Sequence, residues 1–289
     1  MIHPTHELEA ADPLNSRQFL LAIRRLADSL SYGTDASMFR GSGNEYAQSR
    51  LYQAGDPIRS IDWRVTARTR KVHVKEFETP KRIDCYLLVD TSASMVVSST
   101  PRSKYALAVQ LAGGIAFACL DRVSPVALVG VGERDLQVSP SLSRDKVMQW
   151  LFKLRRYSLV ERTQLAARLT ELSTQLRNRA LVVVLSDLHE PAAITLLKNL
   201  AQRHDVVAIQ LRDPAETGLR QIGFIRAREA ETGRIWATRG RRLGLDHDNL
   251  AQELKRGRVD HLLLATDQPV AGRLRHFFKA RGLLGRGAR

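Results

Sequence analysis

The amino-acid sequence predicts an α/β fold: a doubly wound, mostly parallel sheet with helices on both faces. From residue 82 onward, short apolar runs of strand length alternate with longer segments of helical periodicity. Strands separated by helical crossovers are typical of a parallel sheet. The runs at 83–89 and 181–185 are mainly apolar, as expected of strands buried on both faces.

Residues 1–81 predict a smaller N-terminal extension. Apolar residues recur at helical spacing over 16–30, with Ser16 as a candidate cap. Segment 72–77 alternates apolar and polar residues, which is typical of a half-buried strand. We therefore expect a helix and a small β element that pack on the main domain.

The main domain is expected over 82–280, with a basic and disordered tail at 281–289. Right-handed crossovers would place the ends of its parallel strands at one edge of the sheet. Apolar runs predict strands at 83–89, 126–131, 136–138, 181–185, 205–211 and 261–266. Helical periodicity predicts helices at 104–120, 145–154, 164–176, 192–203, 249–255 and 269–280, and turn residues predict a hairpin over 221–238.

Composition is that of an ordinary globular protein, with 44% hydrophobic and 26% charged residues. The two cysteines, Cys85 and Cys119, have apolar neighbours and are interpreted as buried thiols of a reducing compartment. The N-terminus has no signal-peptide pattern. The most apolar helical segment, 105–120, is shorter than the about 20 residues that a bilayer requires. We expect a cytoplasmic protein without a membrane span.

Oxygen-bearing side chains follow the predicted strands. Asp90, Ser92 and Ser94 come directly after the first strand, and Asp187 follows the run at 181–185. Thr163 lies in a polar loop before a helical segment, where an N-cap is expected. Carboxylate and hydroxyl oxygens are ligands that suit Mg²⁺ or Mn²⁺. The alternative is that these residues serve only as helix caps and turns.

This ordered set resembles the metal-ion-dependent adhesion site of von Willebrand factor A domains. The resemblance implies that Ser92 and Ser94 bind Mg²⁺ or Mn²⁺ directly and that Thr163 joins in some states. It also implies that Asp90 and Asp187 act directly or through water. Such sites are often empty until a partner supplies a further ligand.

The segment before the first strand resembles the bacterial domain-of-unknown-function-58 family, whose members carry a von Willebrand A-like domain. The resemblance implies a partner, an AAA+ ATPase of the MoxR group, but no known reaction. Pro57 is a departure, because family members often have a second acidic residue there. The resemblance rests on Gly-x-Gly at 41–43, Glu-Tyr at 45–46, Arg-x-Tyr at 50–52, Gly-Asp at 55–56, Arg-x-Ile-Asp-Trp at 59–63 and Thr-Ala-Arg at 66–68.

These observations predict a non-catalytic, divalent-metal-dependent protein-binding module that assists a MoxR-type ATPase in assembly or chaperone work. The enzyme alternative is a phosphotransferase-like protein with Asp90 as nucleophile. That class resembles Asp-x-Asp-x-Thr, and here Ser92 stands where the second carboxylate, the general acid, is expected.

The formal net charge of +15 leaves nucleic-acid binding as another alternative. Aromatic residues are not interleaved with the basic ones in a stacking motif, which disfavours it. A second candidate surface for protein partners surrounds Trp63, because Trp and Arg are favoured interface anchors. Packing of Trp63 against the sheet is the preferred interpretation of that residue alone. The candidate surface consists of Arg59, Asp62, Trp63, Arg64 and Arg68.

Overall fold

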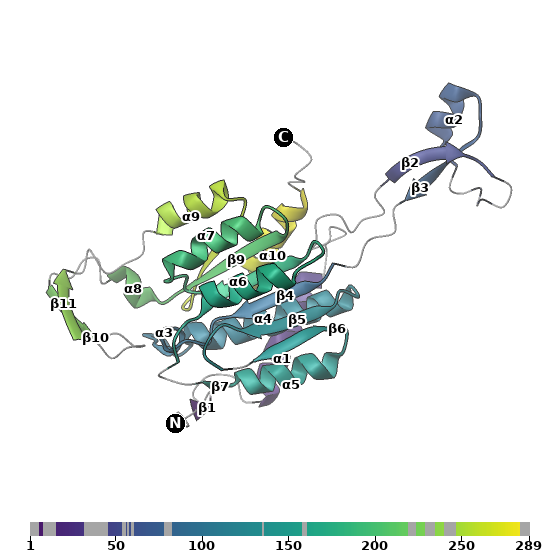
Figure 1. The fold of residues 1–289 in the computed structure, drawn as a ribbon. Helices are drawn as coiled ribbons and strands as arrows, with labels where there is room; N and C mark the ends of the chain where they lie inside the picture. Colours follow the sequence, from purple (N-terminus) through teal and green to yellow (C-terminus); the bar gives the residue numbers. More distant parts are fainter. Residues whose placement is uncertain are drawn as a thin grey trace. The chain divides into compact units, whose positions relative to one another are not determined.

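In the computed structural model, the chain forms two compact units (Figure 1). The sheet domain comprises Met1–Gly33 and Ile83–Phe278, and the small unit comprises Thr34–Arg82 and Lys279–Arg289. Within them, the structure describes residues 6–7, 16–31, 46–53, 56, 58, 61–77, 83–134, 136–157, 161–218, 224–228, 235–239 and 247–283.

A six-stranded sheet forms the centre of the sheet domain. Every neighbouring pair is parallel except β5 and β6, which are antiparallel. The predicted α/β class with a mostly parallel sheet is therefore confirmed. In spatial order the strands are β12 (Asp260–Ala265), β9 (Asp205–Arg212), β8 (Leu181–Ser186), β4 (Cys85–Val89), β5 (Val126–Gly130) and β6 (Gln137–Ser141).

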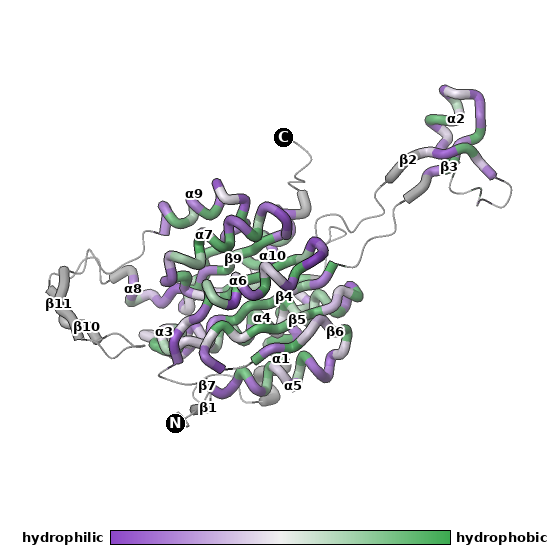
Figure 2. Tube along the Cα trace, in the orientation of Figure 1, coloured by the Kyte–Doolittle hydropathy of each residue, from purple (hydrophilic) through white to green (hydrophobic). Residues whose placement is uncertain are grey.

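Helices cover both faces of this sheet (Figure 1). All six residues of β8 are buried, and the central strands are mainly hydrophobic in Figure 2, as expected between two helical layers. One face packs against α6 (Leu165–Gln175), α7 (Pro191–Leu200) and α9 (His247–Arg256). The other side holds α4 (Lys104–Asp121), α5 (Arg144–Leu154), α1 (Ser16–Ser31) and the part of α10 (Ala271–Leu283) up to Phe278, where the sheet domain ends.

Short elements complete the sheet domain. Two of them, α3 (Ala93–Val96) and α8 (Pro214–Gly218), directly follow strands β4 and β9. The predicted hairpin consists of β10 (Phe224–Arg228) and β11 (Ile235–Arg239), and its turn lies outside the described residues. A further antiparallel pair joins β1 (His6–Glu7) to β7 (Arg156–Tyr157).

Helix α4 is a buried core helix that lies between the sheet and α1. It contacts β4, β5, β8 and β9 on one side and α1 on the other, which explains its nearly continuous apolar sequence. Both cysteines are free and buried. Of the helices that the structure describes, none is long and apolar enough to cross a membrane.

The grouping of α1 differs from the sequence prediction, which joined it to the small β element. Its apolar face, with Ile23, Leu26 and Leu30, is buried, and α1 packs on α4 within the sheet domain. Gly113 and Gly114 of α4 permit this close contact, because neither glycine has a side chain between the helices. The two parts of the predicted extension therefore belong to different units.

In the small unit, β2 (Tyr46–Leu51) pairs antiparallel with β3 (His73–Phe77) beside a short helix, α2 (Trp63–Thr69). Asp62 caps this helix by accepting hydrogen bonds from the N–H groups of Arg64 (3.1 Å) and Val65 (3.2 Å). The Ser49 hydroxyl donates to the same carboxylate at 2.7 Å. Neither α2 nor β2 was predicted.

At the other end of the chain, α10 extends to Leu283, beyond the predicted end of the helix.

The contact between α1 and α4 predicts opposite effects for two glycine substitutions. In Gly114→Ala, the new Cβ would lie 2.5 Å from Cδ2 and 2.6 Å from Cγ of Leu26. Overpacking should outweigh the gain in helix propensity and lower the free energy of unfolding by about 1–2 kcal/mol. The matched control is Gly272→Ala in α10, which meets no atom within 4 Å and should be neutral or stabilising by up to about 1 kcal/mol. Urea unfolding measures both, and equal effects would contradict this account of the helix contact.

Candidate functional site

The parallel pairing of β4 with β8 brings two aspartates to the same edge of the sheet. Val89 lies opposite Leu185 at the carboxyl ends of the strands, and the Asp90 N–H donates to the Leu185 carbonyl at 2.9 Å. Asp90 and Asp187 follow these strands and are 1% and 3% exposed. The edge therefore holds two buried carboxyl groups.

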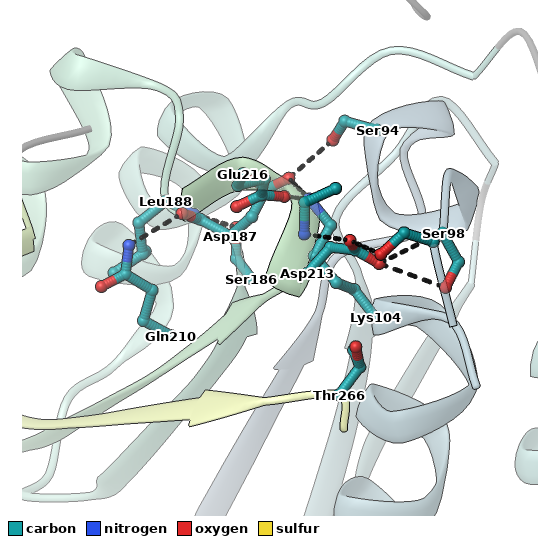
Figure 3. Close-up of polar contacts among 12 residues, drawn as sticks. Ser94, Ser98, Lys104, Ser186, Asp187, Leu188, Gln210, Asp213, Glu216 and Thr266 are labelled. Atoms are coloured by element: carbon teal, nitrogen blue, oxygen red, sulfur yellow. Dashed lines mark hydrogen bonds and ion pairs between the residues drawn. The ribbon is translucent and has the colours of Figure 1, made fainter. Parts of the chain in front are cut away.

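Hydroxyl groups connect these two carboxyl groups. The Ser92 N–H and the Ser186 hydroxyl donate to different oxygens of Asp90, at 3.0 and 2.6 Å. The hydroxyls of Ser92 and Ser94 lie 3.0 Å apart. Ser94 donates to Asp187 Oδ2 at 2.9 Å (Figure 3). Ser92 stands at the N-cap position of α3 but makes no side-chain cap bond. Four of the five predicted residues thus belong to one polar network.

Thr163 lies in a segment that is bonded to the same edge. The Ala93 N–H donates to the Glu161 carbonyl at 2.8 Å, and the Gln164 N–H donates to the Val131 carbonyl at 3.0 Å. These bonds tie the two sides of Thr163 to the loops after β4 and β5. The predicted N-cap assignment of Thr163 is wrong, since Gln164 occupies that position. The carboxylate of Glu190 instead accepts from the Ala166 N–H at 3.1 Å.

Lys104 is a member of the site that sequence analysis missed. It is the first residue of α4 and is 3% exposed. Its ammonium lies 2.9 Å from Asp187 Oδ2 and 2.6 Å from Glu216 Oε1 (Figure 3). The sequence did contain a signal for Lys104, since a lysine in the first turn of a nearly continuous apolar helix is expected to be buried. A buried ammonium requires carboxylate partners.

The electrostatic environments of the two aspartates differ. Burial, followed by the charge of Asp187, raises the pKa of Asp90 to about 7 despite its hydrogen bonds from Ser186 and Ser92. Burial also acts to raise the pKa of Asp187, but Lys104 and His189 outweigh it and lower that pKa. For Lys104 itself, burial favours the neutral amine, but Asp187 and Glu216 outweigh burial and raise the pKa. Asp187 is thus ionised beside a cation, whereas Asp90 is bonded to neutral donors.

Asp213 positions the segment that leads into Lys104. Its carboxylate accepts from the Ser98 hydroxyl (3.2 Å), from the Ser99 hydroxyl and from the N–H groups of Ser99 (2.8 Å) and Ala215 (2.9 Å). Figure 3 shows Asp213 between Ser98 and Glu216. Because Asp213 bonds both segments, it fixes the loop before α4 beside α8, where Glu216 lies.

Glu161 is a second residue that the sequence did not reveal. It is 2% exposed and accepts from the Thr91 hydroxyl (2.8 Å) and from Arg134 Nε (2.6 Å). A Cβ at position 132 would lie 2.0 Å from Glu161 Oε1, so Gly132 leaves space for this carboxylate. The ion pair with Arg134 anchors the segment that carries Thr163.

The donor set fits a small, hard divalent ion such as Mg²⁺ or Mn²⁺. Its side-chain donors at this edge are oxygens of carboxyl and hydroxyl groups, which these ions prefer. Among the described residues, no cluster of three or more His, Cys, Asp and Glu could hold a metal. An ion at this edge would therefore depend on the hydroxyls of Ser92 and Ser94 as well as on aspartate.

The second predicted surface, in the small unit, is brought together only in part. Trp63 is 67% exposed, and Arg64 and Arg68 are exposed as well. The predicted packing of Trp63 on the sheet involves the other unit and stays a prediction. Asp62 is buried as the cap of α2, so its role there is structural. Arg59 lies outside the described residues.

Comparison with known proteins gives a family match. Residues 48–253 match the family described as "Protein of unknown function DUF58". The uncharacterized proteins Rv1480 of Mycobacterium tuberculosis and Mb1516 of Mycobacterium bovis are each 30% identical over 222 residues, covering 75% of this chain and 70% of each relative.

Two solved structures are similar at lower identity. The conserved hypothetical protein BatB of Bacteroides thetaiotaomicron is 14% identical, with a TM-score of 0.46 over 68% of this chain and 98% of that chain. The RO (RSR) protein of Deinococcus radiodurans is 15% identical, with a TM-score of 0.36 over 93% of this chain and 49% of that chain.

Loss of the Glu161 carboxylate should destabilise the protein and loosen the segment around Thr163. Glu161→Ala removes a buried partner of Arg134, and we expect a loss of about 3 kcal/mol in the free energy of unfolding. The matched control is Glu171→Ala, which breaks an exposed ion pair with Arg168 on α6 and should cost less than about 0.5 kcal/mol. Urea unfolding and hydrogen exchange of residues 161–164 measure both effects. Similar losses in the two variants would show that Glu161 is not an anchor.

Proposed function

Because this chain belongs to the DUF58 family of proteins of unknown function, we propose its function from the site itself: a non-catalytic protein-binding module that depends on Mg²⁺ or Mn²⁺. The observation that carries the proposal is the network that joins Asp90, Ser92, Ser94 and Asp187 at the carboxyl edge. Ligand sites in open α/β sheets lie at such edges.

The proposed binding chemistry follows from the small number of charged ligands. Ser92 and Ser94 would hold the ion with neutral hydroxyls, and Thr163 would join in some states. Asp90 and Asp187 would act directly or through water. When bound, the ion would supply positive charge that attracts a carboxylate of a partner protein. The residues of this chain hold the ion, and the partner completes its coordination.

We assign the partner to the MoxR group of AAA+ ATPases on the basis of sequence resemblance. The segment from 41 to 68 has the pattern of a family associated with such ATPases, and the chain contains no P-loop of its own. In this proposal the chain is the adaptor in assembly or chaperone work, and the ATPase supplies the energy. The exposed Trp63, Arg64 and Arg68 are a second candidate contact.

The phosphotransferase alternative is less well supported by the geometry. Both oxygens of Asp90 accept hydrogen bonds, and the residue is 1% exposed. A nucleophile requires an accessible oxygen and, in this class, a second acid nearby. The nucleic-acid alternative rests on the net charge of +15 and predicts binding that weakens steeply with salt.

The proposal predicts that ATPase binding depends on both metal and hydroxyls. In a pull-down of the MoxR-type ATPase, a chelator or the double variant Ser92→Ala, Ser94→Ala should weaken binding at least about tenfold, because each removes part of the ion's coordination. The matched control is Ser173→Ala, Thr174→Ala. These exposed hydroxyls on α6 donate to carbonyls of their own helix, so the control variant should bind normally.

Two results would contradict the proposal. Binding that is unaffected by both chelator and the serine double variant would place the interface elsewhere, and the surface of Trp63, Arg64 and Arg68 would be tested next. Phosphatase turnover that disappears in Asp90→Asn would instead establish the enzyme alternative.

A further inference from the structure

The unexpected feature of the candidate site is a buried cation that belongs to the protein. Lys104 reaches Asp187 Oδ2 and Glu216 Oε1, and the lysine and Asp187 side chains are each 4% exposed. The Ser94 hydroxyl donates to the same oxygen of Asp187. The ammonium therefore lies against the end of the network that the proposed ion would use.

We propose that Lys104 is a resident counter-cation that occupies Asp187 in the metal-free protein and is displaced toward Glu216 when a divalent ion binds. This inference rests on the proposed function, because it assumes that the edge takes up a divalent ion. It assigns Lys104 a role in setting the affinity of the site, as a positioning residue and not as a ligand.

The competition follows from the position of the ammonium. An ion held by Ser94 and Asp187, directly or through water, would approach a like charge that already bonds to Asp187 Oδ2. Like charges a few ångströms apart repel strongly where burial excludes water. Lys104 also neutralises Asp187, which reduces the attraction between this carboxylate and an incoming cation. Both effects make the site bind divalent ions more weakly than its two carboxylates alone would.

Glu216 gives the displaced lysine a second partner. Its Oε1 already lies 2.6 Å from the ammonium, and its side chain is 23% exposed against 4% for Asp187. Movement away from Asp187 would thus leave Lys104 paired and close to solvent. The contacts of Asp213 to Ser99 and to the Ala215 N–H hold Lys104 and Glu216 on adjacent segments. The exchange requires a change in side-chain torsions and no movement of the sheet.

Titration of the full chain with Mn²⁺, by calorimetry and by electron paramagnetic resonance, tests the inference. Lys104→Met should bind Mn²⁺ at least about tenfold more tightly than the wild type, because repulsion and prior neutralisation are both removed. Lys104→Arg keeps the charge and should retain weak binding. The matched control is Lys198→Met, which breaks an exposed ion pair with Glu253 and should leave the affinity unchanged.

Glu216→Gln provides a test that does not require removal of the lysine. Without Glu216, Lys104 has Asp187 as its remaining carboxylate partner, so Mn²⁺ affinity should fall. In the Lys104→Met background, the same substitution should have a much smaller effect, because the effect of Glu216 acts through the lysine. Thermal melting adds a second readout: Mn²⁺ should raise the melting temperature of Lys104→Met more than that of the wild type.

The outcomes separate this inference from the proposed function. Unchanged or weaker Mn²⁺ binding by Lys104→Met, with normal binding by the wild type, overturns the role of Lys104 and leaves the metal site intact. Absence of Mn²⁺ binding in the wild type and in every variant overturns both. If Lys104→Met does not fold, the Glu216→Gln result decides, and unchanged affinity in that variant overturns the inference.

Discussion

The site depends on one structural constraint, the parallel pairing of β4 with β8. This pairing puts Asp90 and Asp187 at the same edge of the sheet, where both are buried. Two carboxylates so close in a dry environment cannot both remain charged without compensation. The protein meets this demand unequally: Lys104 compensates Asp187, whereas Asp90 receives hydrogen bonds from neutral donors. A bound divalent ion would supply positive charge beside Asp90, whose hydrogen-bond donors are neutral.

The sequence predicted most of the sheet because its strands are local and apolar. The runs that become β4 and β8 could be recognised without knowledge of the fold, and the aspartates after them followed from parallel topology. The grouping of α1 could not be predicted in this way. It depends on how Gly113 and Gly114 fit against Ile23 and Leu26, which is a contact between residues distant in the sequence.

The candidate site was predictable where a motif directly follows a strand, and less so where side chains arrive from elsewhere. Asp90, Ser92 and Ser94 belong to one loop, so their spacing was informative. Lys104 and Glu161 join through long-range pairs with Glu216 and Arg134, and a sequence pattern does not encode such pairs. Asp62 illustrates the reverse case. Its sequence motif marked it as a candidate contact for a partner protein, but in the structure its carboxylate caps α2.

The most direct test of the account is a crystal structure of the protein grown with Mn²⁺, with the ion located by its anomalous scattering. The account predicts one strong peak within coordination distance of the Ser92 and Ser94 hydroxyls at the carboxyl edge of β4. The Lys104 ammonium is then expected beyond hydrogen-bond distance of Asp187 Oδ2, to which it now lies at 2.9 Å, while it remains paired with Glu216. A peak elsewhere on the protein, or none at this edge at a Mn²⁺ concentration that saturates binding in solution, would contradict the central claim.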